Sequence, residues 1–335
     1  MIFIRADANE KIGTGHIMRC LSLGQAFASK NQEVIFITAD HRGDTLVQNK
    51  GFRSICLNSD WTNMGDEPLV DLITEKNPDL VLVDSYFATE NYLHSIRNSV
   101  ITAYMDDMNA ACWDVDYLIN YNIFARKTDY SLYKNKNTEL LLGPSFAPLR
   151  KEFEGLPHHE IKENITDILV SAGGADPDGI TLLFLHEICP HLPGVRFHFV
   201  VGVLNPRIQE IKASAPANVV LHINEQHMSE LMTSCDIAVS AAGSTLYELC
   251  ACGIPSITYS LADNQIVAAR QFQEQNVMIN AGDCRNNRDF TGNIESCIHH
   301  LSEDFQLRKT LSAEMQKLVD GHGANRIAER LLQEI

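Results

Sequence analysis

The chain has 335 residues, of which 45% are hydrophobic and 21% charged; this is ordinary for a globular protein and long enough for two domains. Its 27 Lys and Arg residues against 43 Asp and Glu leave a net charge of -16, which argues against nucleic acid or an anionic membrane as a partner. A phosphorylated small molecule stays open, because backbone N–H groups can hold phosphate without basic side chains.

Targeting and metal signals are missing from the sequence. The opening MIFIRAD lacks the basic flank, long apolar region and cleavage site of a signal peptide. No apolar stretch reaches the roughly 18 residues of a membrane span. The nine cysteines are scattered and form no zinc pattern, so we expect reduced, mostly buried thiols. These features predict a cytoplasmic protein without metal or cofactor.

In the first half, short apolar runs alternate with segments of helical period. Strands are expected at 2–7, 33–40, 53–58, 79–85 and 100–107, with shorter ones at 116–120 and 139–143. Helices are expected at 16–30, near 44–50, near 66–76 and at 90–98. Continuous apolar strands separated by helices indicate a parallel sheet that is covered on both faces.

The pattern breaks at the polar segment 153–166, which has no strong period and is interpreted as a linker. The alternation then restarts, with strands expected at 167–174, 197–202, 219–224, 236–243 and 256–260. Helices are expected at 179–189, 206–214, 228–234, 244–252 and 264–275, and two more from about 303 that are broken at 321–323.

The predicted fold class is α/β, with two doubly wound Rossmann-like domains facing a cleft. The domains are expected at 1–155 and 165–319, and a terminal helix at 320–335 is expected to pack back on the first. Ligands of such sheets bind beyond the carboxyl ends of the strands, so the natural site is the cleft between the domains.

The first motif, GTGH, lies where the first strand gives way to a helix. Gly13 and Gly15 begin a dinucleotide fingerprint, but Met18 stands at the place of its third glycine, so the signal for a nicotinamide cofactor is weak. His16 would sit in the first helical turn, where the helix dipole disfavours the imidazolium. A neutral imidazole there can act as a general base. The alternative is a histidine that only packs or caps.

The second motif, SAAGSTLYELCACGIP (240–255), predicts an anion site. Gly243 gives access to the backbone at the end of a strand, and Ser244 and Thr245 can cap the following helix, whose N-terminus suits a diphosphate. Glu248, one turn further, is close enough to accept hydrogen bonds from a ribose diol. The alternative is an ordinary strand–turn–helix with an exposed glutamate.

The third motif, SAGGADPDG, also follows a strand. Gly173 and Gly174 would let a ligand approach the backbone closely. Asp176 and Asp178 are interpreted as caps of the next helix.

Three further strand ends carry polar side chains. Asn264 and Gln265 in LADNQ offer neutral hydrogen bonds to a sugar, or form an ordinary cap cluster. Tyr86 in VDSYF either faces the cleft or packs. Asp106 and Asp107 suggest metal or acid–base work, although aspartates at strand ends usually cap turns.

Together these motifs resemble one family more specifically than any of them does alone. RADANEKIGTGHIMRC, AGGADPDG, SAAGSTLYELCACGIPSI and DNQ are similar to the UDP-2,4-diacetamido-2,4,6-trideoxy-β-L-altropyranose hydrolases of pseudaminic acid biosynthesis. The resemblance covers essentially the whole chain. Its most specific part is the opening R-x-D-x(5)-G-x-G-H-x-x-R segment, because the later motif is shared with UDP-dependent glycosyltransferases.

The resemblance implies a glycosyltransferase-B architecture and a protein that binds a UDP-sugar and water. We separately expect a monomer. His16 would activate the water, and Asn264 and Tyr86 would contact sugar or water. The segment VDSY (83–86) departs from the family pattern, because a histidine is expected beside the tyrosine. The substrate-binding residues would be Gly13, Gly15, Arg19, Gly173, Gly174, Gly243, Ser244, Thr245, Glu248 and Gln265.

One base is enough for such a reaction, because UDP is a good leaving group that needs charge stabilisation rather than the second carboxylate of a glycosidase. Three alternatives remain open from the sequence. They are a UDP-sugar-dependent glycosyltransferase, a UDP-sugar 2-epimerase that uses Asp106 or Asp107, and a non-catalytic UDP-sugar-binding module.

Overall fold

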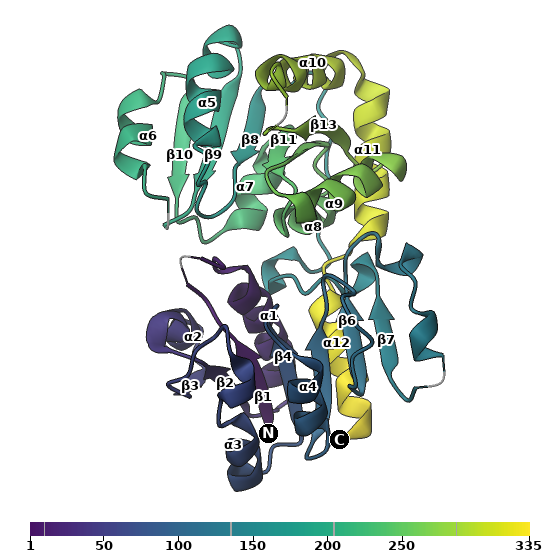
Figure 1. Ribbon diagram of the computed structural model, residues 1–335. Coiled ribbons are helices and arrows are strands. Elements are labelled where there is room, and N and C mark those ends of the chain that lie inside the picture. Colours follow the sequence, from purple (N-terminus) through teal and green to yellow (C-terminus); the bar gives the residue numbers. More distant parts are fainter. Residues whose placement is uncertain (10, 135, 204, 286) are drawn as a thin grey trace. The chain divides into compact units, whose positions relative to one another are not determined.

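The computed structural model describes residues 1–9, 11–134, 136–203, 205–285 and 287–335. It divides the chain into two compact units, each with its own sheet (Figure 1). The first unit contains Met1–Arg150 and His322–Ile335, and the second contains Lys151–Gly321. None of the helices in the described ranges is long and apolar enough to cross a bilayer.

The first unit is built on a parallel sheet in the order β3-β2-β1-β4-β5-β6-β7. Its central strands are continuous apolar runs, which parallel strands covered on both faces require. The strands are β1 (Ile2–Ala6), β2 (Val34–Thr38), β3 (Arg53–Cys56), β4 (Leu80–Asp84), β5 (Ile101–Met105), β6 (Tyr117–Asn120) and β7 (Glu139–Leu142).

Five α-helices belong to this unit, and the last comes from the end of the chain. They are α1 (Gly15–Ser29), α2 (Asp44–Asn49), α3 (Leu69–Lys76), α4 (Glu90–Arg97) and α12 (Gly323–Leu331). Figure 1 draws α12 in yellow within the first unit. It packs beside α1, with Lys30 Nζ 2.8 Å from Glu329 Oε1. A side chain at Gly323 would meet the carbonyl of Ala147, so only glycine permits this approach.

The second unit repeats the plan in the order β10-β9-β8-β11-β12-β13. Its strands are β8 (Asp167–Ser171), β9 (Arg196–Val201), β10 (Val219–Ile223), β11 (Ile237–Ala241), β12 (Ser256–Ser260) and β13 (Ile279–Asp283). Its helices are α5 (Ile180–Glu187), α6 (Ile208–Ser214), α7 (Met228–Ser234), α8 (Thr245–Cys252), α9 (Asp263–Glu274), α10 (Phe290–Glu303) and α11 (Phe305–Leu318).

Two elements of the second unit have no counterpart in the sequence prediction. β13 has the sequence INAGD. Its polar Asn280 and flexible Gly282 interrupt the apolar pattern by which a strand is recognised, so this edge strand was not predicted. α10 carries Gly292 and many polar residues, yet it buries Ile294, Ile298 and Leu301 against the core. In the first unit, the helix expected near 66–76 begins only at Leu69, because Pro68 disfavours helical geometry at the residue before it.

Strand order reverses direction between β1 and β4 in the first sheet and between β8 and β11 in the second. The loops that leave the carboxyl ends of such neighbouring strands diverge to opposite faces and leave space for a ligand. Each unit therefore has one edge at which polar side chains can meet a small molecule.

Candidate functional site

The loop 7–14 joins β1 to α1 and carries His16 into position. Gly13 has a φ of +71°, and it pairs with Asn9 through both of its backbone hydrogen-bonding groups. α1 begins at Gly15, so His16 lies in its first turn as predicted, and this residue is 7% exposed.

His16 is held by the carboxylate that ends β4. Its Nδ1 lies 2.7 Å from Oδ1 of Asp84, and its ring meets the Tyr86 ring edge-on with 4.5 Å between centroids. In the neutral imidazole, a proton on Nδ1 donates to Asp84, which leaves the lone pair on Nε2. The pair therefore selects the tautomer that can accept a proton at Nε2.

Asp84 is itself fixed by Arg19, one helical turn after His16. Nε and Nη2 of Arg19 each donate to Asp84 at 2.6 Å, and the thiol of Cys20 donates at 3.4 Å. Burial alone would raise the pKa of Asp84, but the charge of Arg19 and the hydrogen bonds from Arg19 and His16 outweigh it and hold that pKa well below its usual range. Asp84 is therefore ionised beside His16 near neutral pH.

Asp107 accepts hydrogen bonds from three polar side chains at the carboxyl edge of the first sheet. Its carboxylate accepts from Arg19 Nη1 at 2.8 Å, from the Tyr86 hydroxyl at 3.0 Å and from Asn122 Nδ2 at 3.2 Å. Arg19 also donates to the Tyr121 hydroxyl at 2.9 Å. Burial and Asp107 raise the pKa of Tyr86 well above its usual value, so its phenol stays protonated near neutral pH.

A second buried network fixes the start of the loop. Arg5 is fully buried and forms ion pairs with Asp7 at 2.6 Å and Glu67 at 2.9 Å. Asp7 also accepts from the backbone N–H of Ala39 at 2.8 Å, and Tyr92 donates to Glu67. The ion pair between Arg5 and Asp7 therefore fixes the direction in which the backbone leaves β1.

In the second unit, the predicted nucleotide loops follow three neighbouring strands. Gly173 and Gly174 follow β8, Gly243 and Ser244 follow β11, and the loop before α9 follows β12. No atom lies within 4 Å of where a side chain would stand at Gly173, Gly174 or Gly243. Backbone groups are accessible at these three glycines, and all three are exposed.

The side chains of these loops differ in their hydrogen bonds and in their exposure. Ser244 is the N-cap of α8, but it makes no side-chain cap hydrogen bond, so the expected hydroxyl cap there is wrong. Thr245 starts the helix, and Glu248 lies in its first turn, half-buried. Gln265 accepts from the N–H of Leu261 at 2.8 Å, whereas Asn264 is exposed in the first turn of α9.

Two aspartates that follow strands, Asp176 and Asp106, accept hydrogen bonds from backbone N–H groups. Asp176 accepts from the N–H groups of Ile180 and Thr181 at 2.8 and 3.0 Å, which confirms its capping role. Asp106 accepts from the N–H groups of Met108 and Asn109 and closes a turn after β5. Burial raises the pKa of Asp106.

The predicted residues therefore form two sets. Gly13, Gly15, His16, Arg19 and Tyr86 gather at the carboxyl edge of the first sheet, and the glycines, Ser244, Thr245, Glu248, Asn264 and Gln265 occupy the same edge of the second. Arg19, which was expected to bind substrate, forms ion pairs with Asp84 and Asp107 in the structure.

Sequence reasoning missed Asp84, Tyr121 and Asn122. Asp84 had a usable signal, because it ends a continuous apolar strand (LVLVD) directly before the tyrosine that was singled out. The two others lie far from His16 in sequence, and no local pattern connects them to it.

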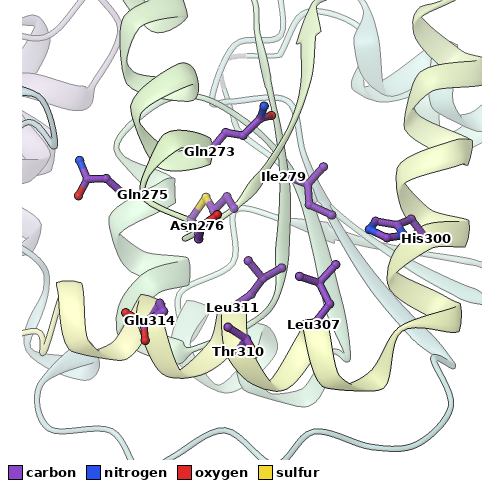
Figure 2. A pocket seen from close by; sticks show the side chains of 10 residues that line it. Gln273, Gln275, Asn276, Ile279, His300, Leu307, Thr310, Leu311 and Glu314 are labelled. Carbon is purple, nitrogen blue, oxygen red and sulfur yellow. The ribbon is translucent and has the colours of Figure 1, made fainter.

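Within the described ranges, no group of three or more His, Cys, Asp or Glu side chains is arranged to hold a metal ion. A cavity of about 650 Å³ lies in the second unit between the end of α9, the start of β13, α10 and α11 (Figure 2). Ile279, the first residue of β13, is among the residues that line it, and none of the predicted site residues is.

No protein-family model matches the chain. It is 24% identical over 348 residues to the spore coat polysaccharide biosynthesis protein SpsG of Bacillus subtilis, a match that covers 99% of this chain and 97% of that protein. It is 25% identical over 256 residues to the UDP-2,4-diacetamido-2,4,6-trideoxy-β-L-altropyranose hydrolase of Campylobacter jejuni, covering 74% of this chain and 86% of that protein.

Among solved structures, MurG of Acinetobacter baumannii matches with a TM-score of 0.70 over 99% of both chains, at 10% sequence identity. This likeness confirms the predicted glycosyltransferase-B architecture of two parallel α/β sheets.

Proposed function

We propose that the chain is a nucleotide-sugar hydrolase that removes UDP from UDP-2,4-diacetamido-2,4,6-trideoxy-β-L-altropyranose by attack of water at the anomeric carbon. The observation that carries the proposal is the His16–Asp84 pair, which leaves Nε2 of a buried histidine as a proton acceptor at a ligand-binding edge. The distant similarity to the Campylobacter jejuni hydrolase supports the choice of substrate.

In this mechanism, Nε2 of His16 accepts a proton from water as the oxygen bonds to the anomeric carbon and the bond to UDP breaks. Asp84 holds the tautomer and stabilises the imidazolium that forms, as a positioning residue. A single base suffices, since UDP departs as a stable anion and needs no proton. Tyr86 orients the imidazole through its ring contact, while its phenol stays bound to Asp107.

The second unit would hold the nucleotide. Backbone N–H groups around Gly243 and at the N-terminus of α8 would bind the diphosphate and stabilise the charge of the leaving group. Gly173 and Gly174 would allow close approach, Glu248 would accept from the ribose hydroxyls, and Asn264 and Gln265 would contact the sugar. Replacement of Glu248 by Ala is then expected to weaken UDP binding in calorimetry.

The alternatives differ in what the first unit must supply. A 2-epimerase would need Asp106 or Asp107 as acid and base, but Asp106 closes a turn and Asp107 is tied to Arg19, Tyr86 and Asn122. A glycosyltransferase shares the fold of MurG and would need an acceptor other than water. A binding module would need no base at all.

The deciding experiment incubates the protein with the UDP-sugar in ¹⁸O-labelled water. Hydrolysis at carbon places the label in the free sugar, hydrolysis at phosphorus places it in the nucleotide, and the C2 configuration of the product is read from the same sample. Label in the sugar with the C2 configuration retained is expected. Absence of free sugar unless an acceptor is added would overturn the proposal in favour of a transferase.

A variant test separates catalysis from binding. His16→Ala should lower kcat by about 10²–10⁴-fold, the usual contribution of a general base, and leave UDP affinity unchanged. His41 provides the control, because it also pairs with an aspartate, Asp44, at 2.6 Å but is exposed. His41→Ala should retain full activity, and an unchanged kcat in His16→Ala would remove His16 from its role.

A further inference from the structure

Asn9 carries an amide group that the catalytic proposal does not use. The residue follows β1 and is only 6% exposed. Its Oδ1 accepts hydrogen bonds from the backbone N–H groups of Lys11 and Ile12, at 2.9 and 3.0 Å. Its Nδ2 is buried and has no hydrogen-bond partner in the part of the chain that the structure describes.

The orientation of this amide is determined by its surroundings. A flipped amide would turn Nδ2 toward the two backbone N–H groups, and donor would face donor. The oxygen must therefore stay in the turn, and the nitrogen must point away from it. A buried donor without a partner is costly, and in native proteins it usually marks a place for water or a ligand.

The position of Asn9 favours a ligand. Its backbone pairs with Gly13 and closes the loop that leads into α1 and His16. No atom lies within 4 Å of where side chains at Gly13 or Gly15 would stand, so there is open space beside the loop at these two glycines. Asn9 lies between β1 and α1, and His16 lies in the first turn of α1, both at the carboxyl edge of the first sheet.

The charge around this loop indicates what kind of ligand oxygen Asn9 would meet. The two networks that flank it bring four carboxylates against two guanidinium groups, namely Asp7, Glu67, Asp84 and Asp107 against Arg5 and Arg19. Both guanidiniums are already bound by carboxylates. A diphosphate would be repelled here, whereas a neutral hydroxyl or acetamido carbonyl would not.

We infer that Asn9 is a substrate-binding residue whose Nδ2–H donates to a neutral acceptor oxygen of the sugar, an acetamido carbonyl or a hydroxyl, and not to the phosphates. The inference deepens the proposed function and rests on it. It adds sugar recognition to the same loop that carries the base.

The test is Asn9→Asp, since a carboxylate still accepts from Lys11 and Ile12 and preserves the turn while the donor is lost. With the UDP-diacetamido sugar, kcat/KM should fall about 10- to 100-fold, and the affinity for UDP alone should not change. Asn280→Asp is the matched control, because Asn280 Oδ1 also accepts from a turn N–H, that of Gly282, at 2.9 Å. It should behave as wild type.

Other outcomes distinguish the inference from the proposed function. An Asn9→Asp protein with normal kcat/KM, whether or not its melting temperature falls, would assign the donor to a buried water and overturn the inference. Should Asn9→Asp fail to fold, Asn9→Ser, which also lacks the amide donor, is expected to show the same loss, and normal kcat/KM in it would overturn the inference.

Binding can be tested without turnover in a His16→Ala background. There, Asn9→Asp should weaken binding of the UDP-diacetamido sugar at least tenfold, by about 1.4 kcal/mol, and leave UDP binding unchanged. This measurement decides the inference even if the wild-type protein proves not to be a hydrolase. Equal affinities of both proteins for the UDP-sugar would refute it.

Discussion

At the scale of residues, one buried carboxylate organises the site of the first unit. Asp84 accepts from His16, Arg19 and Cys20, so it sets the tautomer of the histidine and the position of the arginine together. Such a carboxylate contributes to catalysis without touching substrate. Its replacement should therefore affect turnover more than binding.

Asp84→Asn is expected to lower kcat by about 10²–10⁴-fold, because the amide no longer selects the productive tautomer or stabilises the imidazolium. It should also reduce the free energy of unfolding by about 3–5 kcal/mol, since Arg19 loses a buried partner. Steady-state kinetics and urea unfolding measure both effects. Asp40→Asn, at a partly exposed aspartate paired with Arg42, is the control and should change neither. Wild-type kcat in Asp84→Asn would contradict the positioning role.

The same carboxylate predicts the pH dependence of stability. The folded state lowers the pKa of Asp84, so its stabilisation is complete above the ordinary value of about 3.9 and is lost as the pH falls toward the folded-state pKa. The difference in unfolding free energy between wild type and Asp84→Asn should shrink as the pH falls below about 4. A difference that shrinks near neutral pH would contradict this assignment.

Two substitutions of Tyr86 can distinguish the contribution of its ring from that of its hydroxyl. Its phenol donates to Asp107 and stays protonated, while its ring contacts His16. Tyr86→Phe keeps the ring and should retain kcat within about fivefold, whereas Tyr86→Ala should lose more than about tenfold as the imidazole gains freedom. Equal losses in the two variants would instead assign the hydroxyl a direct part in the reaction.

At the scale of elements, local signals were informative where one side chain or one period decides the geometry. Alternating apolar strands and helices were predicted correctly along most of the chain, and Asp176 was recognised as a cap. β13 was missed because an edge strand needs no continuous apolar run, and INAGD has neither period nor branched residues apart from Ile279. The Ser244 cap failed because its backbone is already helical, so its side chain does not reach the first turn.

The cap of α5 can be tested by a paired substitution. Asp176 accepts from two N–H groups and has a φ of +44°, a conformation that alanine adopts poorly. Asp176→Ala should therefore reduce the free energy of unfolding by about 1–3 kcal/mol in urea denaturation. Asp178→Ala, two residues along at an exposed position, should stay within about 0.5 kcal/mol of wild type. Equal effects would contradict the assignment of the cap to Asp176.

At the scale of the whole molecule, the sequence predicted the order of most strands and helices along the chain, but it did not predict which distant residues come into contact. Two sheets follow from two runs of strand–helix alternation, because each strand needs helices on both faces. The meeting of His16 with Asp84 depends on strand order, which places β4 beside β1 although 68 residues separate the two side chains. The ion pairs of Arg19 with Asp84 and Asp107 were not predicted for the same reason, since these carboxylates are distant from it in sequence.

The final prediction concerns the independence of the two units. Ile327 on α12 is fully buried in the first unit, and Ile294 on α10 is fully buried in the second. Either change to Ala should cost about 2–5 kcal/mol, through lost burial and the cavity that remains. In hydrogen exchange of the full chain, Ile327→Ala should reduce protection in peptides from 1–150 and leave those from 151–321 unchanged, and Ile294→Ala should do the reverse. If either variant lowered protection equally in both sets, the two sheets would belong to one cooperative unit, and the terminal helix would stabilise more than the sheet it packs on.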